Sequence, residues 1–248
     1  MRLTIVGCSG SFPGPVSPAS CYLIEHDGYR VLLDMGNGSL GALARYIDIY
    51  DVNAVAISHL HIDHCADLAS YYVARKYCRS GPLPPIPVFG PVGVAERLSA
   101  MYGPDRGVAM TDIFDFHAYG AEAMNAGPFT ITSHRVRHCV PAYALRAEAG
   151  GRSIVYSGDT GPCDELIDAS RGADIALYDA SYLSRETNPT DLHMTGSDGA
   201  RIAMAAGVGR LILTHLVPWN DSAEVLAEAA ALYNRDVRLA SPGMVEEI

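Results

Sequence analysis

Three histidines and one aspartate stand close together in the chain, at His59, His61, Asp63 and His64, directly after the apolar run 54–57. Side chains two positions apart on an extended segment point to the same side, so His59 and His61 can bind one metal ion. Asp63 and His64 then turn toward a second ion. Imidazole nitrogen suits zinc, and a carboxylate oxygen also suits manganese or iron. This density therefore favours two divalent metal ions a few ångströms apart over a solvated polar turn.

The segment 59–64 reads His-x-His-x-Asp-His and resembles the signature of the metallo-β-lactamase superfamily. The resemblance implies a further histidine, then a metal-bridging aspartate in a Gly-Asp-Thr-like turn, then a last histidine at the end of a strand. The chain offers His138, Asp159 and His215 in that order. It is therefore identified as a member of this superfamily over nearly its whole length. The fold this implies is of the α/β class, a four-layer αβ/βα sandwich with the metals at one edge.

The resemblance also divides the ligands between the two ions. One ion would be held by His59, His61 and His138, the other by Asp63, His64 and His215, and Asp159 would bridge them. His134 is the alternative to His138, but the register of the segment 140–146, which resembles the corresponding part of tRNase Z-like enzymes, favours His138. His26 and His117 lack such partners and are expected to be structural.

A second histidine and carboxylate pair separates branches of the superfamily. Asp179 ends an apolar run, and His193 stands just before an expected helix at 196–206. In tRNase Z-like phosphodiesterases a histidine at this place is held by a carboxylate and acts on the leaving oxygen. The resemblance therefore assigns this role to His193, with Asp179 as its partner, although the family more often has glutamate there. With Asp63 these two are the expected catalytic residues; a helix N-cap is the alternative for the region of His193.

Two segments near the N-terminus resemble supporting parts of such a site. Residues 32–36 resemble the family's Leu-Asp-x-Gly, in which the aspartate, here Asp34, supports the metal loop from behind. A simple turn is the alternative. The small residues 7–11 resemble the glycine-rich first loop of the phosphodiesterase branch, although small residues also make tight turns for conformational reasons alone.

The overall composition bounds the fold and the substrate. With 248 residues, 49% of them hydrophobic, the chain can bury a substantial core, and one domain covering 1–248 is expected. The formal net charge is −10. A protein that grips a long polyanion usually presents a basic field to its phosphates, and this chain has the opposite balance.

The spacing of the expected ligands in the second half of the chain also argues against a long nucleic acid as the substrate. Only 21 positions separate His138 from Asp159, too few for the long arm with which tRNase Z commonly grips tRNA. We therefore expect a dinuclear metal-dependent phosphodiesterase that acts on small phosphodiesters, most of all cyclic nucleotides, and has no stable nucleic-acid partner. The alternatives are a tRNase Z-like ribonuclease and a metal-dependent lactone or thioester hydrolase.

The sequence also carries information on the cellular compartment. No run approaches 18 consecutive apolar residues, and Met1 and Arg2 lead directly into the strand-like segment 3–6, so neither a membrane span nor a signal peptide is expected. The six cysteines form no Cys-x-x-Cys pair, which is typical of reduced thiols. A cytoplasmic enzyme without membrane partners is expected, and the resemblance allows a homodimer.

Strands and helices must alternate to position these groups. Strands are expected at 3–6, 21–25, 29–33, 88–89, 114–119, 129–133, 153–156 and 211–214. Helices are expected at 39–49, 66–77, 92–102 and 196–206. The proline-rich stretch 81–87 is a crossing segment. The polar loop 104–112 is expected to be a surface connection, with a lid over the site as the alternative.

Overall fold

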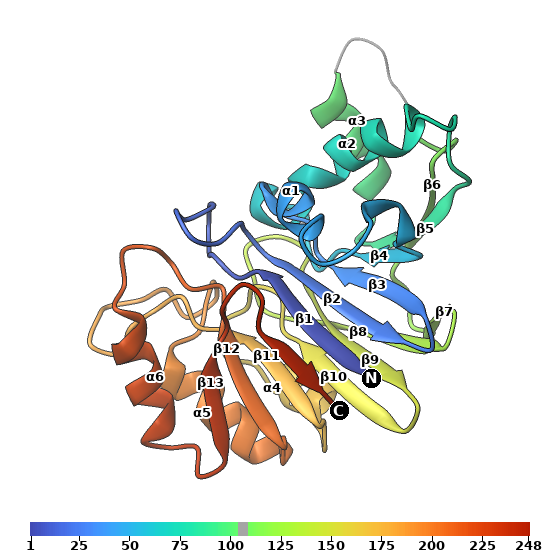
Figure 1. The fold of residues 1–248 in the computed structure, drawn as a ribbon. Coiled ribbons are helices and arrows are strands. Elements are labelled where there is room, and N and C mark those ends of the chain that lie inside the picture. The colour runs from blue at the N-terminus through green and yellow to red at the C-terminus, as the bar shows by residue number, and fades with distance from the viewer. Residues whose placement is uncertain (104–108) are drawn as a thin grey trace.

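The computed structural model describes residues 1–103 and 109–248, so residues 104–108 of the expected surface loop lie outside the described part. In the described ranges the chain forms two seven-stranded sheets that pack face to face, with helices on both outer faces (Figure 1). Each sheet combines antiparallel with parallel pairs. This arrangement is the four-layer αβ/βα sandwich that the sequence predicts.

The first sheet is built from the N-terminal half and the last strand of the chain. Its strands are β1 (Arg2–Gly7), β2 (Cys21–His26), β3 (Tyr29–Leu33), β4 (Ala54–Ala56), β5 (Ile86–Gly90), β6 (Phe114–Ala118) and β14 (Val245–Glu247), in the order β14-β1-β2-β3-β4-β5-β6. Its outer face carries α1 (Ser39–Leu43), a 3₁₀ turn (Ile49–Asp51), α2 (Ile62–Lys76) and α3 (Val94–Tyr102). The strands from β3 to β6 are parallel neighbours, so their carboxyl ends lie at one edge.

The second sheet follows the same plan. Its strands are β7 (Met124–Ala126), β8 (Phe129–Arg135), β9 (Tyr143–Ala149), β10 (Arg152–Tyr156), β11 (Ile175–Asp179), β12 (Arg210–Thr214) and β13 (Asp236–Leu239), in the order β13-β12-β11-β10-β9-β8-β7. The helices α4 (Asp164–Ser170), α5 (Gly196–Ala206) and α6 (Ser222–Ala230) cover its outer face. The strands from β10 to β13 are parallel, as in the first sheet.

The core explains why the strands read as nearly continuous apolar runs. Along β2, Tyr22 and Ile24 pack between the two sheets, whereas Cys21 and Leu23 pack under the helices of the first sheet. Strands buried on both faces lose the alternation of polar and apolar residues that a half-exposed strand shows. Among the described residues, no helix combines the length and apolar character needed to cross a membrane.

Three helix boundaries differ from those expected. The helix expected at 39–49 ends at Leu43, and a separate 3₁₀ turn follows because the carboxylate of Asp48 accepts a hydrogen bond from the Tyr50 amide. The helix expected at 92–102 begins at Val94, after a left-handed Gly93. The third difference concerns the site directly: the helix expected at 66–77 begins four residues earlier, at Ile62.

Candidate metal centre

The candidate ligands gather where parallel strands of both sheets end. His59 and His61 lie in the loop between β4 and α2, and Asp63 and His64 occupy the first turn of α2. In the second sheet Asp159 and His215 follow β10 and β12, and His138 lies between β8 and β9. Because parallel strands end at the same edge of a sheet, residues from distant parts of the sequence meet there.

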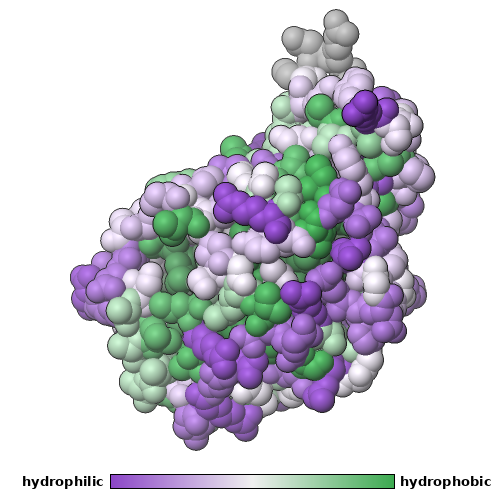
Figure 2. Space-filling model, viewed as in Figure 1, coloured by the Kyte–Doolittle hydropathy of each residue, from purple (hydrophilic) through white to green (hydrophobic). Residues whose placement is uncertain are grey.

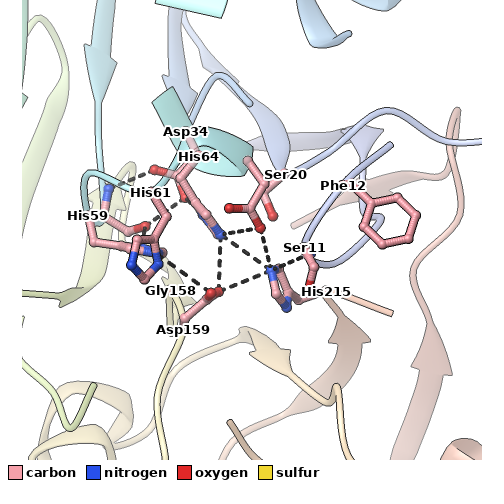
Figure 3. Close-up of polar contacts among 12 residues, drawn as sticks. Ser11, Phe12, Ser20, Asp34, His59, His61, His64, Gly158, Asp159 and His215 are labelled. Atoms are coloured by element: carbon pink, nitrogen blue, oxygen red, sulfur yellow. Dashed lines mark hydrogen bonds and ion pairs between the residues drawn. The ribbon is translucent and has the colours of Figure 1, made fainter. Parts of the chain in front are cut away.

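Seven side chains that the sequence predicts as ligands form two groups in space, shown in part in Figure 3. The first group is His59, His61, His138 and Asp159; the second is Asp63, His64, Asp159 and His215. Within each group the candidate ligand atoms all lie within 4.8 Å of one another. Asp159 belongs to both groups, as the expected bridging residue should.

Hydrogen bonds behind the site fix which ring nitrogen points inward in four of the five candidate ligand histidines. In the first half of the chain, Asp34 accepts hydrogen bonds from Ser58 Oγ and from His64 Nδ1, each at 2.7 Å. Because Ser58 gives its proton to Asp34, its Oγ accepts from Nδ1 of His59, which lies 3.1 Å away. Both histidines therefore carry the proton on Nδ1 and turn the lone pair of Nε2 toward the centre.

The second half of the chain orients its histidines in the same way. His138 Nδ1 donates to the backbone oxygen of Leu192 at 2.9 Å. His215 Nδ1 lies 2.8 Å from Ser181 Oγ, and that hydroxyl in turn donates to Asp179 at 2.7 Å. Backbone carbonyls and carboxylates in these positions leave Nε2 unprotonated, which is the form of imidazole that binds a metal.

Apart from the Ser11 amide, which lies 3.4 Å from His215 Nε2, the inward-facing nitrogen atoms face one another rather than hydrogen-bond donors. His59 Nε2 lies 3.0 Å from His61 Nδ1, and His64 Nε2 lies 3.3 Å from the Nε2 of His215. Among the described residues, the buried Oδ1 of Asp159 has no hydrogen-bond partner. Converging lone pairs and an unsatisfied buried carboxylate oxygen are costly unless a cation neutralises them. The residues therefore fit divalent metal ions.

His193 and Asp179 lie beside this cluster and contact each other. His193 Nδ1 is 2.8 Å from Asp179 Oδ2, so the aspartate side chain is long enough to hold the ring. His193 is also stacked on His215, with ring centroids 5.2 Å apart. The alternative role of a helix cap is taken by another residue, because Thr195 caps α5 together with Asp198.

Comparison with known proteins gives the family. A model of the beta-lactamase superfamily domain matches residues 29–216. The chain belongs to the metallo-β-lactamase superfamily. Curated relatives in this superfamily include the uncharacterized protein Rv1339 of Mycobacterium tuberculosis, 40% identical over 242 residues (96% of this chain, 88% of the relative). The probable metallo-hydrolase YhfI of Bacillus subtilis is 30% identical over the full length of both chains, and the ribonuclease Z of Mycolicibacterium gilvum is 30% identical over 88% of this chain and 85% of its own.

Solved structures of superfamily members confirm the predicted fold. The crystal structure of YhfI from Bacillus subtilis superimposes with a TM-score of 0.88 at 29% identity and covers 99% of both chains. The short form of human tRNase Z shares the fold at 20% identity, with a TM-score of 0.81 over 100% of this chain and 99% of its own. The 30% identical relatives named metallo-hydrolase and ribonuclease Z make the chain a hydrolase of the tRNase Z-like branch, as the motifs predict.

Burial and neighbouring charges shift the pKa values of the candidate ligands in this superfamily site. Burial holds the pKa of His59 well below its usual value and also lowers the pKa of His61, so both imidazoles are neutral. Burial tends to lower the pKa of His64 and of His215, but the facing Asp159 raises both. Burial tends to raise the pKa of Asp159, but these two histidines lower it well below the usual range, so a bound cation would take the place of the extra protons on the histidines. The carboxylate in the middle of the cluster is therefore ionised and suited to a cation.

Several residues that build the site give no signal in the sequence. Ser58 and Ser181 orient ligand histidines through their hydroxyl groups. Tyr156, from the second sheet, donates from its hydroxyl to Asp34 of the first sheet at 2.7 Å and so ties the two halves together beneath the cluster. His134, the alternative ligand, lies on β8 and belongs to neither group of four among the described residues.

Gly36 determines how closely the Asp34 turn approaches α2. A Cβ atom at this position would lie 1.9 Å from the backbone oxygen of Asp63, a distance that only a shift of the backbone can relieve. We expect Gly36→Ala to lower the free energy of unfolding by about 1–3 kcal/mol, because overpacking has that cost, and to reduce metal content.

Gly41 provides a matched control for this substitution. It lies in α1, and a Cβ there would meet nothing within 4 Å. Gly41→Ala should be neutral or should stabilise the fold by about 0.5–1 kcal/mol, because alanine suits a helix better than glycine does. Denaturant unfolding with metal analysis measures both variants, and equal stability of the two would show that the Gly36 contact is unimportant.

Proposed function

We propose that the chain is a dinuclear metal-dependent phosphodiesterase that hydrolyses small phosphodiesters, with cyclic nucleotides as the favoured substrates. The observation that carries the proposal is the His193 and Asp179 pair, which lies beside two four-residue groups suited to metal ions. Cleavage of the ester bond to phosphorus releases a strongly basic alkoxide. An acid held at this place can protonate that alkoxide.

The proposed ligand set follows the two spatial groups. His59, His61 and His138 would hold one ion, Asp63, His64 and His215 the other, and Asp159 would bridge them. Nitrogen-rich sites of this kind suit zinc, with manganese or iron as alternatives. Two bound divalent ions supply Lewis acidity that neutralises phosphate charge and lowers the pKa of water. The protein holds these ligands rigidly through Asp34, Ser58 and Ser181.

His193 would act as the general acid. Asp179 holds its Nδ1 at 2.8 Å, which leaves Nε2 to face the substrate. Burial tends to lower the pKa of His193, but the charge and hydrogen bond of Asp179 raise it above the usual value. A raised pKa favours the protonated ring, which can give its proton to the leaving oxygen. Asp179 is buried and acts by positioning, since it holds His193 directly and His215 through Ser181.

The shape of the second sheet supports a small substrate. The strands β9 and β10 pair directly, with Ala149 opposite Arg152, and the turn between them consists of two glycines with positive φ. The segment in which tRNase Z carries its arm is therefore a tight hairpin. With the net charge of −10, this leaves little to attract a large structured RNA.

A ribonuclease is the second candidate because relatives 30% identical to the chain are named ribonuclease Z. The proposed preference is tested by supplying the metal-loaded protein with 3′,5′- and 2′,3′-cyclic nucleotides and, separately, with a precursor tRNA. We expect at least one cyclic nucleotide to be hydrolysed with a kcat/KM far above that for the tRNA. Efficient, site-specific trimming at the 3′ end of the precursor would contradict the proposal and favour the second candidate.

A further inference from the structure

Two exposed aromatic side chains lie together at the rim of the site. The rings of Phe12 and Trp219 have centroids 5.6 Å apart and are tilted by 33°. They remain 47% and 64% exposed, respectively, so each ring keeps much of its surface open to solvent. Trp219 is the only tryptophan of the chain. Large aromatic surfaces left open beside a site are typical of ligand contacts.

Backbone contacts connect this pair to the ligand cluster. The amide of Ser11, the residue before Phe12, donates to His215 Nε2 at 3.4 Å. The Gly10 amide donates to the backbone oxygen of Leu216 at 3.1 Å, so the loop is attached to the segment that carries His215. Figure 3 shows Ser11 next to His215 and the ring of Phe12 beyond it, away from Asp159. Phe12 therefore directly follows a residue that contacts the proposed second metal site, and Trp219 lies four positions after the ligand His215.

The loop is held in this position against local strain. Ser11 has a φ of 63° and His215 a φ of 55°, and both are left-handed conformations that residues with side chains rarely adopt. A Cβ at Gly10 would lie 2.5 Å from the backbone oxygen of His215, so the approach is as close as glycine permits. Strain of this kind persists where the surrounding structure enforces it, and it gathers at functional sites.

The surroundings of the pair are apolar rather than basic. A cavity of about 310 Å³ lies next to the pair, between the same two segments, and is lined by their neighbours in the chain, among them Val16, Val217 and Pro218, rather than by the two rings themselves. No basic side chain from the described part of the chain lines it. Figure 2 shows a green, hydrophobic hollow where the N-terminal loop meets the chain near α6. A flat, uncharged group suits this rim better than a phosphate does.

We propose that Phe12 and Trp219 form a stacking face for the base of the nucleotide whose phosphate lies at the metal centre. This inference rests on the proposed phosphodiesterase function. Both ester oxygens of a cyclic phosphate belong to one ribose, so the base stays a short, fixed distance from phosphorus. Stacking depends on π-surface and not on positive charge, so it is available to a protein with a net charge of −10.

The test compares two substrates that differ only in the base. Cyclic 3′,5′-AMP and the 3′,5′-cyclic phosphate of 1-O-methylribose have the same reacting ester oxygens. For Phe12→Leu and for Trp219→Leu in the metal-loaded protein, we expect KM for cyclic AMP to rise about tenfold, because stacking on a side chain contributes that much per base. KM for the base-free substrate and kcat for both substrates should stay as in the wild type.

An exposed aromatic residue far from the site serves as the matched control. Tyr77 directly follows α2, and its side chain is 68% exposed. The candidate ligands Asp63 and His64 lie at the opposite end of that helix, in its first turn. Tyr77→Leu should change neither KM. Because Trp219 is the only tryptophan, its fluorescence gives a direct second measurement. In the metal-loaded His193→Ala variant, cyclic AMP should quench the emission and the base-free substrate should not.

The outcomes separate this inference from the function on which it rests. If the wild type hydrolyses neither these substrates nor a 2′,3′-cyclic nucleotide, the phosphodiesterase proposal itself is wrong; if it hydrolyses only the 2′,3′-cyclic nucleotide, the same comparison is made with that nucleotide and its base-free analogue. If both substrates are hydrolysed but Phe12→Leu and Trp219→Leu affect them equally, or if cyclic AMP leaves the fluorescence unchanged, the stacking face is rejected. A shift of the variants to a smaller species in size-exclusion chromatography, without a base-dependent change in KM, would assign the pair to contacts between two copies of the chain instead.

Discussion

Asp159→Ala is expected to abolish phosphodiester hydrolysis and to weaken the binding of metal ions by ~100-fold or more. Asp159 is the one residue that belongs to both ligand groups, and it is almost fully buried. Its loss would remove a ligand from each proposed ion. It would also leave His64 and His215 without the negative charge that faces them at 3.2 and 3.4 Å.

The measurement combines elemental analysis with activity on a cyclic nucleotide. Wild-type protein purified without chelators should contain about two zinc, manganese or iron ions per chain, and Asp159→Ala should contain far less. His134→Ala is the matched control, because His134 lies on β8 outside both groups. Full metal content together with full activity in Asp159→Ala would show that the carboxylate does not bridge the ions.

His193→Ala is expected to slow the hydrolysis of a cyclic nucleotide by ~10²- to 10⁴-fold while leaving the metal content intact. The ribose oxygen leaves as a strongly basic alkoxide and needs a proton from the acid. A nitrophenolate leaves without that help, so activity on a nitrophenyl phosphodiester should fall much less. Asp179→Asn should show the same pattern in weaker form, because it loosens the hold on His193 Nδ1.

Parallel rate measurements on the two substrates at full metal occupancy decide this assignment. Equal losses on both would show that the imidazole of His193 positions phosphate and does not donate a proton. A drop in metal content would instead make His193 a ligand. The geometry permits that role, because the potential ligand atoms of His193, Asp159, Asp179 and His215 all lie within 4.8 Å of one another.

The sequence predicts which candidate ligands come together better than it predicts the side chains that orient them. His59, His61, Asp63 and His64 are recognisable because their spacing is local. The distant ligands follow from the order of family motifs, and the structure brings them to the same edge of the fold. The helix α2 begins four residues earlier than expected, because Asp63 suits the first turn of a helix and the pattern of apolar residues appears only later.

Contacts between remote segments could not be derived in this way. Tyr156 bonds to Asp34 across 122 positions, and the apolar run that contains Tyr156 reads as an ordinary buried strand. Phe12 and Trp219 meet only because the first loop is attached to the segment after β12. Such contacts depend on how the two sheets pack, and no periodicity in the sequence encodes that packing.

Hydrolysis of a cyclic nucleotide, measured beside a lactone and a thioester in one metal-loaded sample, tests the central claim most directly. The proposed function predicts that the phosphodiester is cleaved at the highest kcat/KM, that chelation of the metal abolishes this activity and that added zinc or manganese restores it. Rapid cleavage of the lactone or thioester with no turnover of any cyclic nucleotide would contradict it.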